Sequence, residues 1–164
     1  MTIPHRLSDD RLGDYRPCVG IVLINPAGHI FTARRTDTPD AWQMPQGGID
    51  ADEDPRTAAL RELAEETGVV DVSVLDETPG WLAYDLPPEI AAKLWGGQFR
   101  GQRQKWFACR HIGSDTAIDL SHHSPEFDAW RWSPPDQVLR DIVAFKRAVY
   151  RDVLEHFRPY IQAF

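Results

Sequence analysis

The stretch GGIDADEDPRTAALRELAEETG, which runs from Gly47 to Gly68, decides how the rest of the chain is interpreted. Seven of its 22 residues are acidic, and Glu62, Glu65 and Glu66 fall within five consecutive positions. Like charges three or four residues apart on a helix repel each other and cost about 0.2–0.5 kcal/mol per pair. Such crowding indicates that the acids serve a purpose that offsets their repulsion.

This stretch has the signals of a helix with defined ends. Asp54 followed by Pro55 is typical of a helix start, and Gly68 is typical of a helix stop, so we predict a helix over about 55–67. The helical period places the three glutamates on one side. The opposite side would carry Leu60, Leu63, Ala64 and Thr67.

Carboxylates at this spacing lie within a few ångströms of each other, which is close enough to share a hard divalent cation. Arg61 precedes Glu65 by one turn and could orient a carboxylate through charged hydrogen bonds. The alternative is an acidic face that only contacts water. That alternative is weakened because no Lys or Arg lies between Arg61 and Lys93.

The whole chain has the composition of one globular domain, which we expect to span residues 1–164, since 42% of its residues are hydrophobic and 26% are charged. A net charge of −7 argues against sequence-blind binding to DNA or RNA, so a polyanionic partner would need a local basic patch or metal ions. Cys18 and Cys109 are expected to be buried thiols. With no apolar signal segment and no membrane-length run, the sequence favours a cytoplasmic protein without membrane contact.

Short alternating or β-branched runs predict strands, and one long apolar period predicts a second helix. The runs at 18–24 and 30–35 are expected to pair as a hairpin around the turn NPAGH. The segment 136–157 has apolar residues at helical spacing and is expected to form one continuous helix. Further strands are expected within 42–49, 72–78, 80–87, 105–112 and 127–133, which gives a mixed sheet with two main helices.

The spacing from Gly47 through Glu53 to RELAEETGV resembles, at nine fixed positions, the Nudix box G-x5-E-x7-R-E-U-x-E-E-x-G-U, where U is aliphatic. The resemblance implies an α/β fold, the Nudix α/β/α sandwich with a mixed β-sheet. It also implies a hydrolase that uses Mg²⁺, or Mn²⁺ or another divalent metal. Glu62, Glu65 and Glu66 would be metal ligands, with Gly47 adding its backbone carbonyl. The ion pair of Glu53 and Arg61 would support the loop and helix.

Further blocks, among them WQMPQGGID, GQRQKWF, PEFDAWRW and VAFKRAVYRDV, resemble the bacterial RNA 5′-pyrophosphohydrolases and the related dinucleoside polyphosphate hydrolases. This likeness implies that Glu126 adds a carboxylate to the metal site and is a candidate proton acceptor. Phe145 would stack on a base, although its helical stripe equally suits a core residue. The other implied substrate-binding residues are Arg16, Arg35, Tyr84, Lys105 and Lys146, and a surface position remains the alternative for the arginines.

Two pairs of adjacent residues, one of arginines and one of histidines, are less informative about the site. Only one of Arg34 and Arg35 should face the site, because strand neighbours point to opposite faces. His122 and His123 form a pair without a third ligand and are expected to be loop residues, not a zinc site.

Three functions are compatible with these residues. The first is removal of pyrophosphate, or of one phosphate at a time, from the 5′-triphosphate end of RNA to leave a monophosphate. The second is cleavage of diadenosine tetraphosphate to ATP and AMP by the same chemistry. The third is a catalytically silent binding module, which would predict loss of a box glutamate, and all of them are present. The sequence identifies no protein partner.

Overall fold

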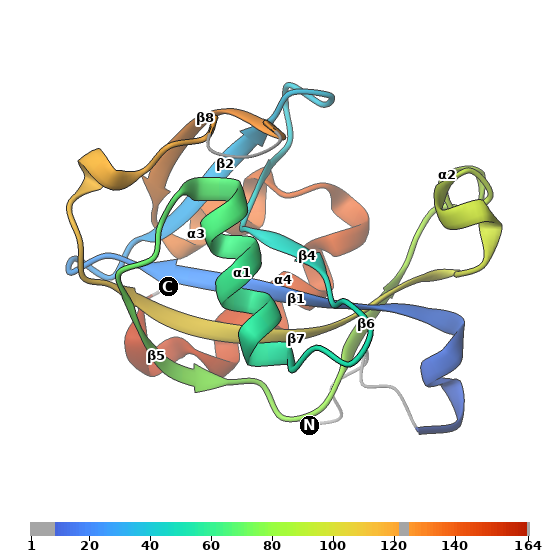
Figure 1. The fold of residues 1–164 in the computed structure, drawn as a ribbon. Helices are drawn as coiled ribbons and strands as arrows, with labels where there is room; N and C mark the ends of the chain where they lie inside the picture. The colour runs from blue at the N-terminus through green and yellow to red at the C-terminus, as the bar shows by residue number, and fades with distance from the viewer. Residues whose placement is uncertain (1–8, 122–124, 164) are drawn as a thin grey trace.

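The computed structural model describes residues 9–121 and 125–163, so the predicted loop position of His122 and His123 lies outside the described residues. Its eight strands form one mixed sheet, with α1 on one face and α3 and α4 on the other (Figure 1). This is the α/β/α sandwich expected from the sequence.

The strands are β1 (Tyr15–Ile24), β2 (Ile30–Arg35), β3 (Trp42–Gln43), β4 (Gln46–Gly48), β5 (Val72–Glu77), β6 (Leu82–Asp85), β7 (Gly101–His111) and β8 (Phe127–Ser133). The α-helices are α1 (Pro55–Thr67), α2 (Pro88–Ala91), α3 (Pro135–Asp141) and α4 (Arg147–His156), with 3₁₀ turns η1 (Asp9–Asp14), η2 (Leu94–Gly97), η3 (Asp115–Ala117), η4 (Ala144–Lys146) and η5 (Arg158–Tyr160).

The centre of the sheet is a long parallel pair, β1 beside β7, which is in register from Tyr15 with Gly101 to Ile24 with Arg110. Alternate residues of β1 supply the two cores. Val19, Ile21 and Leu23 pack toward α1, whereas Val22 and Ile24 pack toward α4. This alternation is the period of two that a sheet covered on both faces requires.

The predicted hairpin of β1 and β2 is confirmed only next to its turn, where Ile24 pairs with Ile30. Beyond that pair the two strands diverge, and β4 takes the place beside β1, with Val19 opposite Gly47. β2 pairs instead with β3 and β8. The divergence therefore positions the start of the Gly47–Gly68 stretch directly against the central strand.

Helix α1 has the predicted bounds and caps. The Asp54 side chain accepts hydrogen bonds from the backbone of Arg56 and Thr57, and Gly68 ends the helix with φ of 74°. Its faces differ in part from the prediction, because Leu60 is 36% exposed and Glu66 is only 6% exposed. The helix is turned so that Glu66 lies against β4, where its carboxylate accepts a hydrogen bond from the backbone N–H of Gln46, and Ala58 and Ala59 are buried along with it.

The single helix predicted over 136–157 is wrong. The chain leaves α3 with extended backbone at Ile142 and Val143, passes through η4 and restarts as α4. The Arg147 side chain donates to the carbonyls of Leu139 and Ile142, at 2.9 and 3.1 Å, and so satisfies carbonyls that a helix end leaves unpaired. The break moves Phe145 off the buried helical stripe.

None of the helices in the described part of the chain combines the length and apolarity needed to cross a lipid bilayer.

Cys18 and Cys109 are both buried free thiols, as predicted, and burial raises their pKa values to about 11 and about 12.

Candidate active site

Arg61 joins the loop after β4 to helix α1. Its guanidinium binds both carboxylate oxygens of Glu53, at 2.8 and 2.9 Å, and donates to the Gly48 carbonyl at 3.0 Å. The same group reaches Glu62 at 3.0 Å and Glu65 at 3.3 Å. The hydrogen bonds from Arg61 lower the pKa of Glu53 to about 2, so that pair stays charged across the neutral range. Arg61 thereby fixes the loop and two of the predicted metal ligands in one network.

Three carboxylates, Glu62, Glu66 and Glu126, line one cavity, and the charge of Glu126 acts on both Glu62 and Glu66. Burial raises the pKa of Glu66 well above its usual value, and the charges of Glu126 and Glu62 raise it further. A hydrogen bond from the backbone N–H of Gln46, at 3.2 Å, and the charge of Arg35 oppose that rise. Burial also raises the pKa of Glu62, against the lowering effect of Arg61. The negative charge of this cluster is therefore under-compensated by the protein's own cations.

Gly47 borders the same cluster. A Cβ atom at this position would lie well inside 3.0 Å of all three atoms of the Glu62 carboxyl group. Glycine at 47 is thus required by the close approach of a carboxylate to the backbone of β4.

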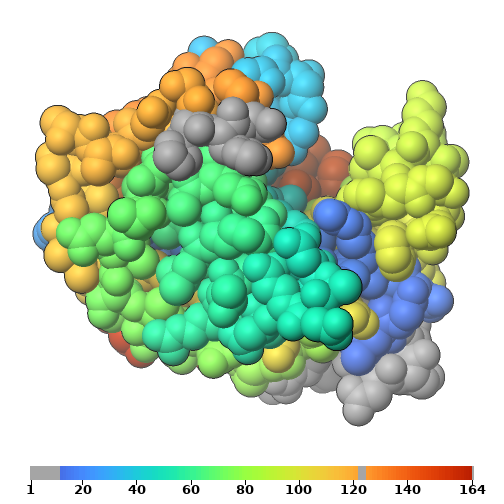
Figure 2. Space-filling model, in the orientation of Figure 1, coloured from blue at the N-terminus to red at the C-terminus, as the bar shows by residue number. Residues whose placement is uncertain are grey.

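The cavity has a volume of about 850 Å³, which is within the range of small-molecule sites. In Figure 2 it opens as a hollow between the segment after β2 and the projecting segment that contains α2. Glu65 and Lys105 are not among its lining residues. Lys105 lies on the other face of the β6–β7 pair, with its ammonium 5.1 Å from the centre of the Trp81 ring. The predicted site residues that line the cavity are Arg16, Arg35, Gly47, Glu62, Glu66, Tyr84, Glu126, Phe145 and Lys146.

Three cations contribute to the cavity in different ways. Arg35 faces it and Arg34 does not, and Arg35 is held by a two-point ion pair with Asp37, at 2.7 and 2.8 Å. Arg16 lies over the ring of Trp95 at 5.0 Å. Lys146 is 7% exposed, and its burial lowers its pKa to about 8, with the nearby Arg35 charge as a further cause. The cavity therefore offers positive charge as well as carboxylates.

Two aromatic rings complete the wall near Lys146. Phe145 and Tyr84 have ring centres 5.8 Å apart, and the Lys146 ammonium lies 5.7 Å from the Tyr84 ring centre. Phe145 is partly buried against the core on the α4 side and also lines the cavity, so its position is compatible with both the stacking role and the core role.

A NUDIX domain profile matches residues 14–153 of the chain. The chain belongs to the Nudix family. The RNA pyrophosphohydrolase of Rhodospirillum rubrum is 59% identical to this Nudix chain over 140 residues, which cover 85% of each protein. The family resemblance read from the sequence is thereby confirmed.

Solved structures confirm the Nudix fold. The dihydroneopterin triphosphate pyrophosphohydrolase of E. coli superposes with a TM-score of 0.68 at 17% identity and covers 87% of this chain and 98% of its own. A C. elegans Ap4A hydrolase binary complex gives 0.65 at 18% identity and covers 88% and 99%. At such identities the likeness concerns the fold alone.

The donor set of the Nudix cavity suits a divalent metal ion, which generally accompanies this family. Glu62, Glu66 and Glu126 are oxygen donors, which Mg²⁺ prefers, and their mutual repulsion is what a cation would relieve. Within residues 9–121 and 125–163, no three acidic, histidine or cysteine side chains are positioned to hold an ion by themselves. Water ligands, which Mg²⁺ characteristically retains, are compatible with such a spacing.

Several residues that line the Nudix cavity or lie next to it were assigned no role from the sequence. The Tyr84 hydroxyl donates to Gln102 at 2.8 Å, and Gln104 donates to both Gln102 and Gln46, at 3.2 and 3.3 Å. The alternation of Gln102 and Gln104 in GQRQKWF was a usable signal that both lie on one face of a strand. The apolar residues Ile90, Leu94 and Trp95 also line the cavity, and their only signal was an apolar cluster within LPPEIAAKLWGG.

Proposed function

We propose that the protein is a divalent-metal-dependent pyrophosphohydrolase that acts on the 5′-triphosphate end of RNA. In the proposed reaction water adds to a phosphorus atom and the anhydride bond between the α- and β-phosphates breaks. Pyrophosphate is released, and the RNA keeps a 5′-monophosphate. The observation that carries the proposal is one cavity lined by three carboxylates, three cations and two aromatic rings. The name of the Rhodospirillum rubrum relative supports RNA as the substrate.

We propose that Glu62, Glu66 and Glu126 hold the metal ion, which is Mg²⁺ or another divalent cation, together with the Gly47 carbonyl. When bound, the ion supplies neutralisation of phosphate charge and activation of the attacking water. Glu65 lies outside the cavity lining and stays a predicted ligand through its position in the Nudix box, with Arg61 donating to it at 3.3 Å. Arg61 acts as a support because it contacts Glu62 and does not line the cavity, and Glu53 supports it in turn by pairing with Arg61.

A carboxylate of the same cluster takes the proton of the attacking water. Glu66 and Glu126 are the candidates, since the negative charge of Glu126 raises the pKa of the buried Glu66 and so increases its affinity for a proton. A general base is most effective when its pKa lies near the working pH.

The remaining cavity residues would bind the polyphosphate and a base. Arg16, Arg35 and Lys146 supply charge for phosphate oxygens, and substrate phosphate would compete with Asp37 for Arg35. Phe145 and Tyr84 offer an apolar face for stacking a nucleobase. Lys105 is left out of this set because it lies over Trp81, on the face away from the cavity.

Cleavage of diadenosine tetraphosphate to ATP and AMP is the second candidate, and it would use the same carboxylates and cations. A side-by-side measurement of kcat/KM with Mg²⁺, on a triphosphorylated oligonucleotide and on diadenosine tetraphosphate, separates the two. We expect the oligonucleotide to be preferred. A clear preference for the dinucleotide would reverse the assignment, and no hydrolysis of either would favour the silent binding module.

We further propose that residues 1–164 act as a single Nudix domain in the cytoplasm. The buried free thiols of Cys18 and Cys109 support a reducing compartment. No DNA or membrane ligand is part of the proposal.

A further inference from the structure

Residues 87–99 form an arm that projects from the sheet between β6 and β7 (Figure 1). It contains α2 and η2, and it presents Ile90 and Leu94, which belong to neither hydrophobic core, beside Trp95, which is partly buried against the core on the α4 side. Ile90 is 37% exposed and Leu94 is 39% exposed, and both line the cavity together with Trp95. The arm therefore gives the cavity an apolar wall separate from Phe145.

Trp95 is held in an unusual backbone conformation, with φ of 49° and ψ of 34°. The left-handed region is disfavoured for a bulky residue, and strained residues of this kind cluster at ligand sites. Gly96 and Gly97 follow with positive φ values of 66° and 72°. This turn brings the Trp95 ring to the cavity and over Arg16.

Arg16 is confined between the arm and β4. Its guanidinium carbon lies 5.0 Å from the centre of the Trp95 ring. On the β4 side, a Cβ added at Gly48 would come within 2.9 Å of that same carbon. The guanidinium is thus held between the indole and Gly48, so a stacking nucleobase would use the face of the Trp95 ring that Arg16 does not cover, with the Arg16 charge behind the ring.

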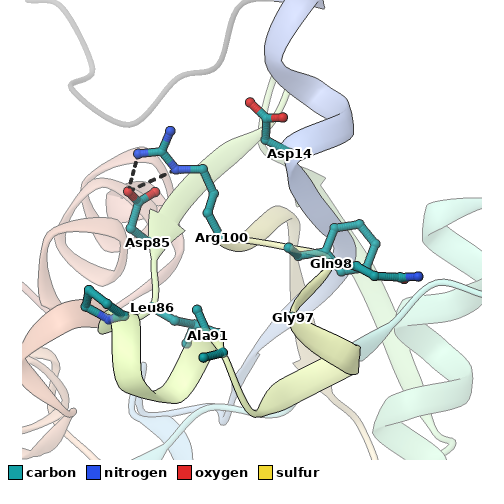
Figure 3. Close-up of a pocket in the computed structure, with 10 residues that line it drawn as sticks. Asp14, Asp85, Leu86, Ala91, Gly97, Gln98 and Arg100 are labelled. Atoms are coloured by element: carbon teal, nitrogen blue, oxygen red, sulfur yellow. Dashed lines mark hydrogen bonds and ion pairs between the residues drawn. The ribbon is translucent and has the colours of Figure 1, made fainter.

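The base of the arm is fixed to the sheet by the contact of Arg100 with Asp85, which Figure 3 shows. These two residues and several residues of the arm line a second cavity of about 640 Å³. Arg100 pairs with Asp85 at 2.6 Å, and the Tyr15 hydroxyl donates to the same carboxylate at 2.6 Å. The backbone N–H of Leu86 also donates to the Arg100 carbonyl at 2.9 Å. These contacts set the position of the arm relative to the cavity.

We propose that the arm is a second base-binding surface, in which one base of the substrate stacks on the paired Trp95 and Arg16 against Ile90 and Leu94. Phe145 would take a different base of the same substrate. The hollow in Figure 2 lies between the arm and the segment after β2, with the region of α3 and α4 at its back, so a two-base substrate has a wall on each side. This inference rests on the proposed function and specifies that the enzyme recognises two bases.

The test combines Trp95→Ala with removal of single bases from the substrate. The substrates are a 5′-triphosphorylated dinucleotide and its two abasic forms, each lacking one base. We expect Trp95→Ala to raise KM about tenfold on the intact dinucleotide, the scale of one base–aromatic stack. On one of the abasic forms the same variant should change KM little. Trp95→Phe, which keeps a ring, should restore most of the loss.

Trp81→Ala is the matched control, because Trp81 also lies beneath cations, Arg103 and Lys105, but does not line the cavity. If Trp95→Ala does not fold, Leu94→Ser tests the same surface at an exposed position and should raise KM in the same base-dependent pattern. An equal loss on all three substrates would reduce Trp95 to a positioning residue for Arg16 and overturn the proposal, as would unchanged kinetics.

Failure of the arm to bind a base can be distinguished from failure of the proposed RNA substrate. If wild-type protein does not hydrolyse the triphosphorylated dinucleotide, RNA is not the substrate, and the arm is then tested with diadenosine tetraphosphate against adenosine tetraphosphate. A Trp95→Ala effect confined to the two-base compound would sustain the arm's role, and its absence would refute it.

Discussion

Gly47→Ala is the most direct test of the carboxylate cluster, because the change adds one methyl group to the backbone beside Glu62. The new Cβ would overlap all three atoms of the Glu62 carboxyl group. Restoring a normal contact of about 3.5 Å requires that carboxyl to move by about 1 Å or more. The atoms that must move are the far end of a side chain, so the fold should persist.

A misplacement of about 1 Å at a catalytic group can cost about 100-fold in rate, or roughly 2.7 kcal/mol of transition-state stabilisation. We therefore expect kcat of Gly47→Ala to fall about 100-fold in a steady-state assay with saturating Mg²⁺. The circular dichroism spectrum should remain that of the wild type.

Gly48→Ala is the matched control in the same strand. Its Cβ would meet the Arg16 guanidinium and not a carboxylate, so we expect a rise in KM with a smaller change in kcat. If Gly47→Ala kept wild-type kcat, or if both variants lost the same parameter by the same factor, the role assigned to Glu62 would be wrong.

Three further predictions follow from the buried charges. Glu66→Gln keeps an acceptor for the Gln46 N–H but loses the charge, so turnover should fall roughly 10²–10⁴-fold in a folded protein. Asp52→Asn, in the loop before the helix, is the control and should keep near-normal turnover; near-normal turnover of Glu66→Gln would contradict the prediction. Mg²⁺ at tenfold excess over its dissociation constant should add about 1.4 kcal/mol and raise Tm by about 3–5 °C, and a melting curve equally shifted by NaCl of matched ionic strength would argue against a specific site. Burial lowers the pKa of Lys146 from 10.5 to about 8, so its charge costs stability below pH 8 and that cost vanishes as the pH rises toward 10.5. Lys146→Met should accordingly have a free energy of unfolding up to about 3 kcal/mol above that of the wild type at pH 7, seen as a higher Tm, and this difference should disappear between pH 8 and 10.5. A difference that grows with pH would contradict the direction of the Lys146 pKa shift.

Local signals predicted the elements whose ends depend on nearby residues. The cap at Asp54 and the stop at Gly68 gave the bounds of α1, and the alternation in FDAWRWS gave the bounds of β8. The Nudix spacing also identified Arg61 as a support, and the structure adds its contact with the Gly48 carbonyl.

Features that depend on distant residues were not predictable from local patterns. The break after α3 depends on Arg147 reaching back to the carbonyls of Leu139 and Ile142, and the apolar period continues through that break. The burial of Glu66 depends on β4 crossing above it, which follows from the divergence of β1 and β2. The arm was missed because its apolar residues lie on short turns without a strand or helix period.

The parallel pairing of β1 with β7 also has a consequence for biosynthesis. β1 is made early, but its longest partner begins only at Gly101, so a nascent chain holds this apolar strand without its main neighbour until most of the protein has left the ribosome. Such non-local pairing slows folding, and unpaired strand edges favour aggregation. The central strand of the sheet thus has an edge that stays unpaired until β7 has been made, and a chaperone that covers this edge would reduce aggregation.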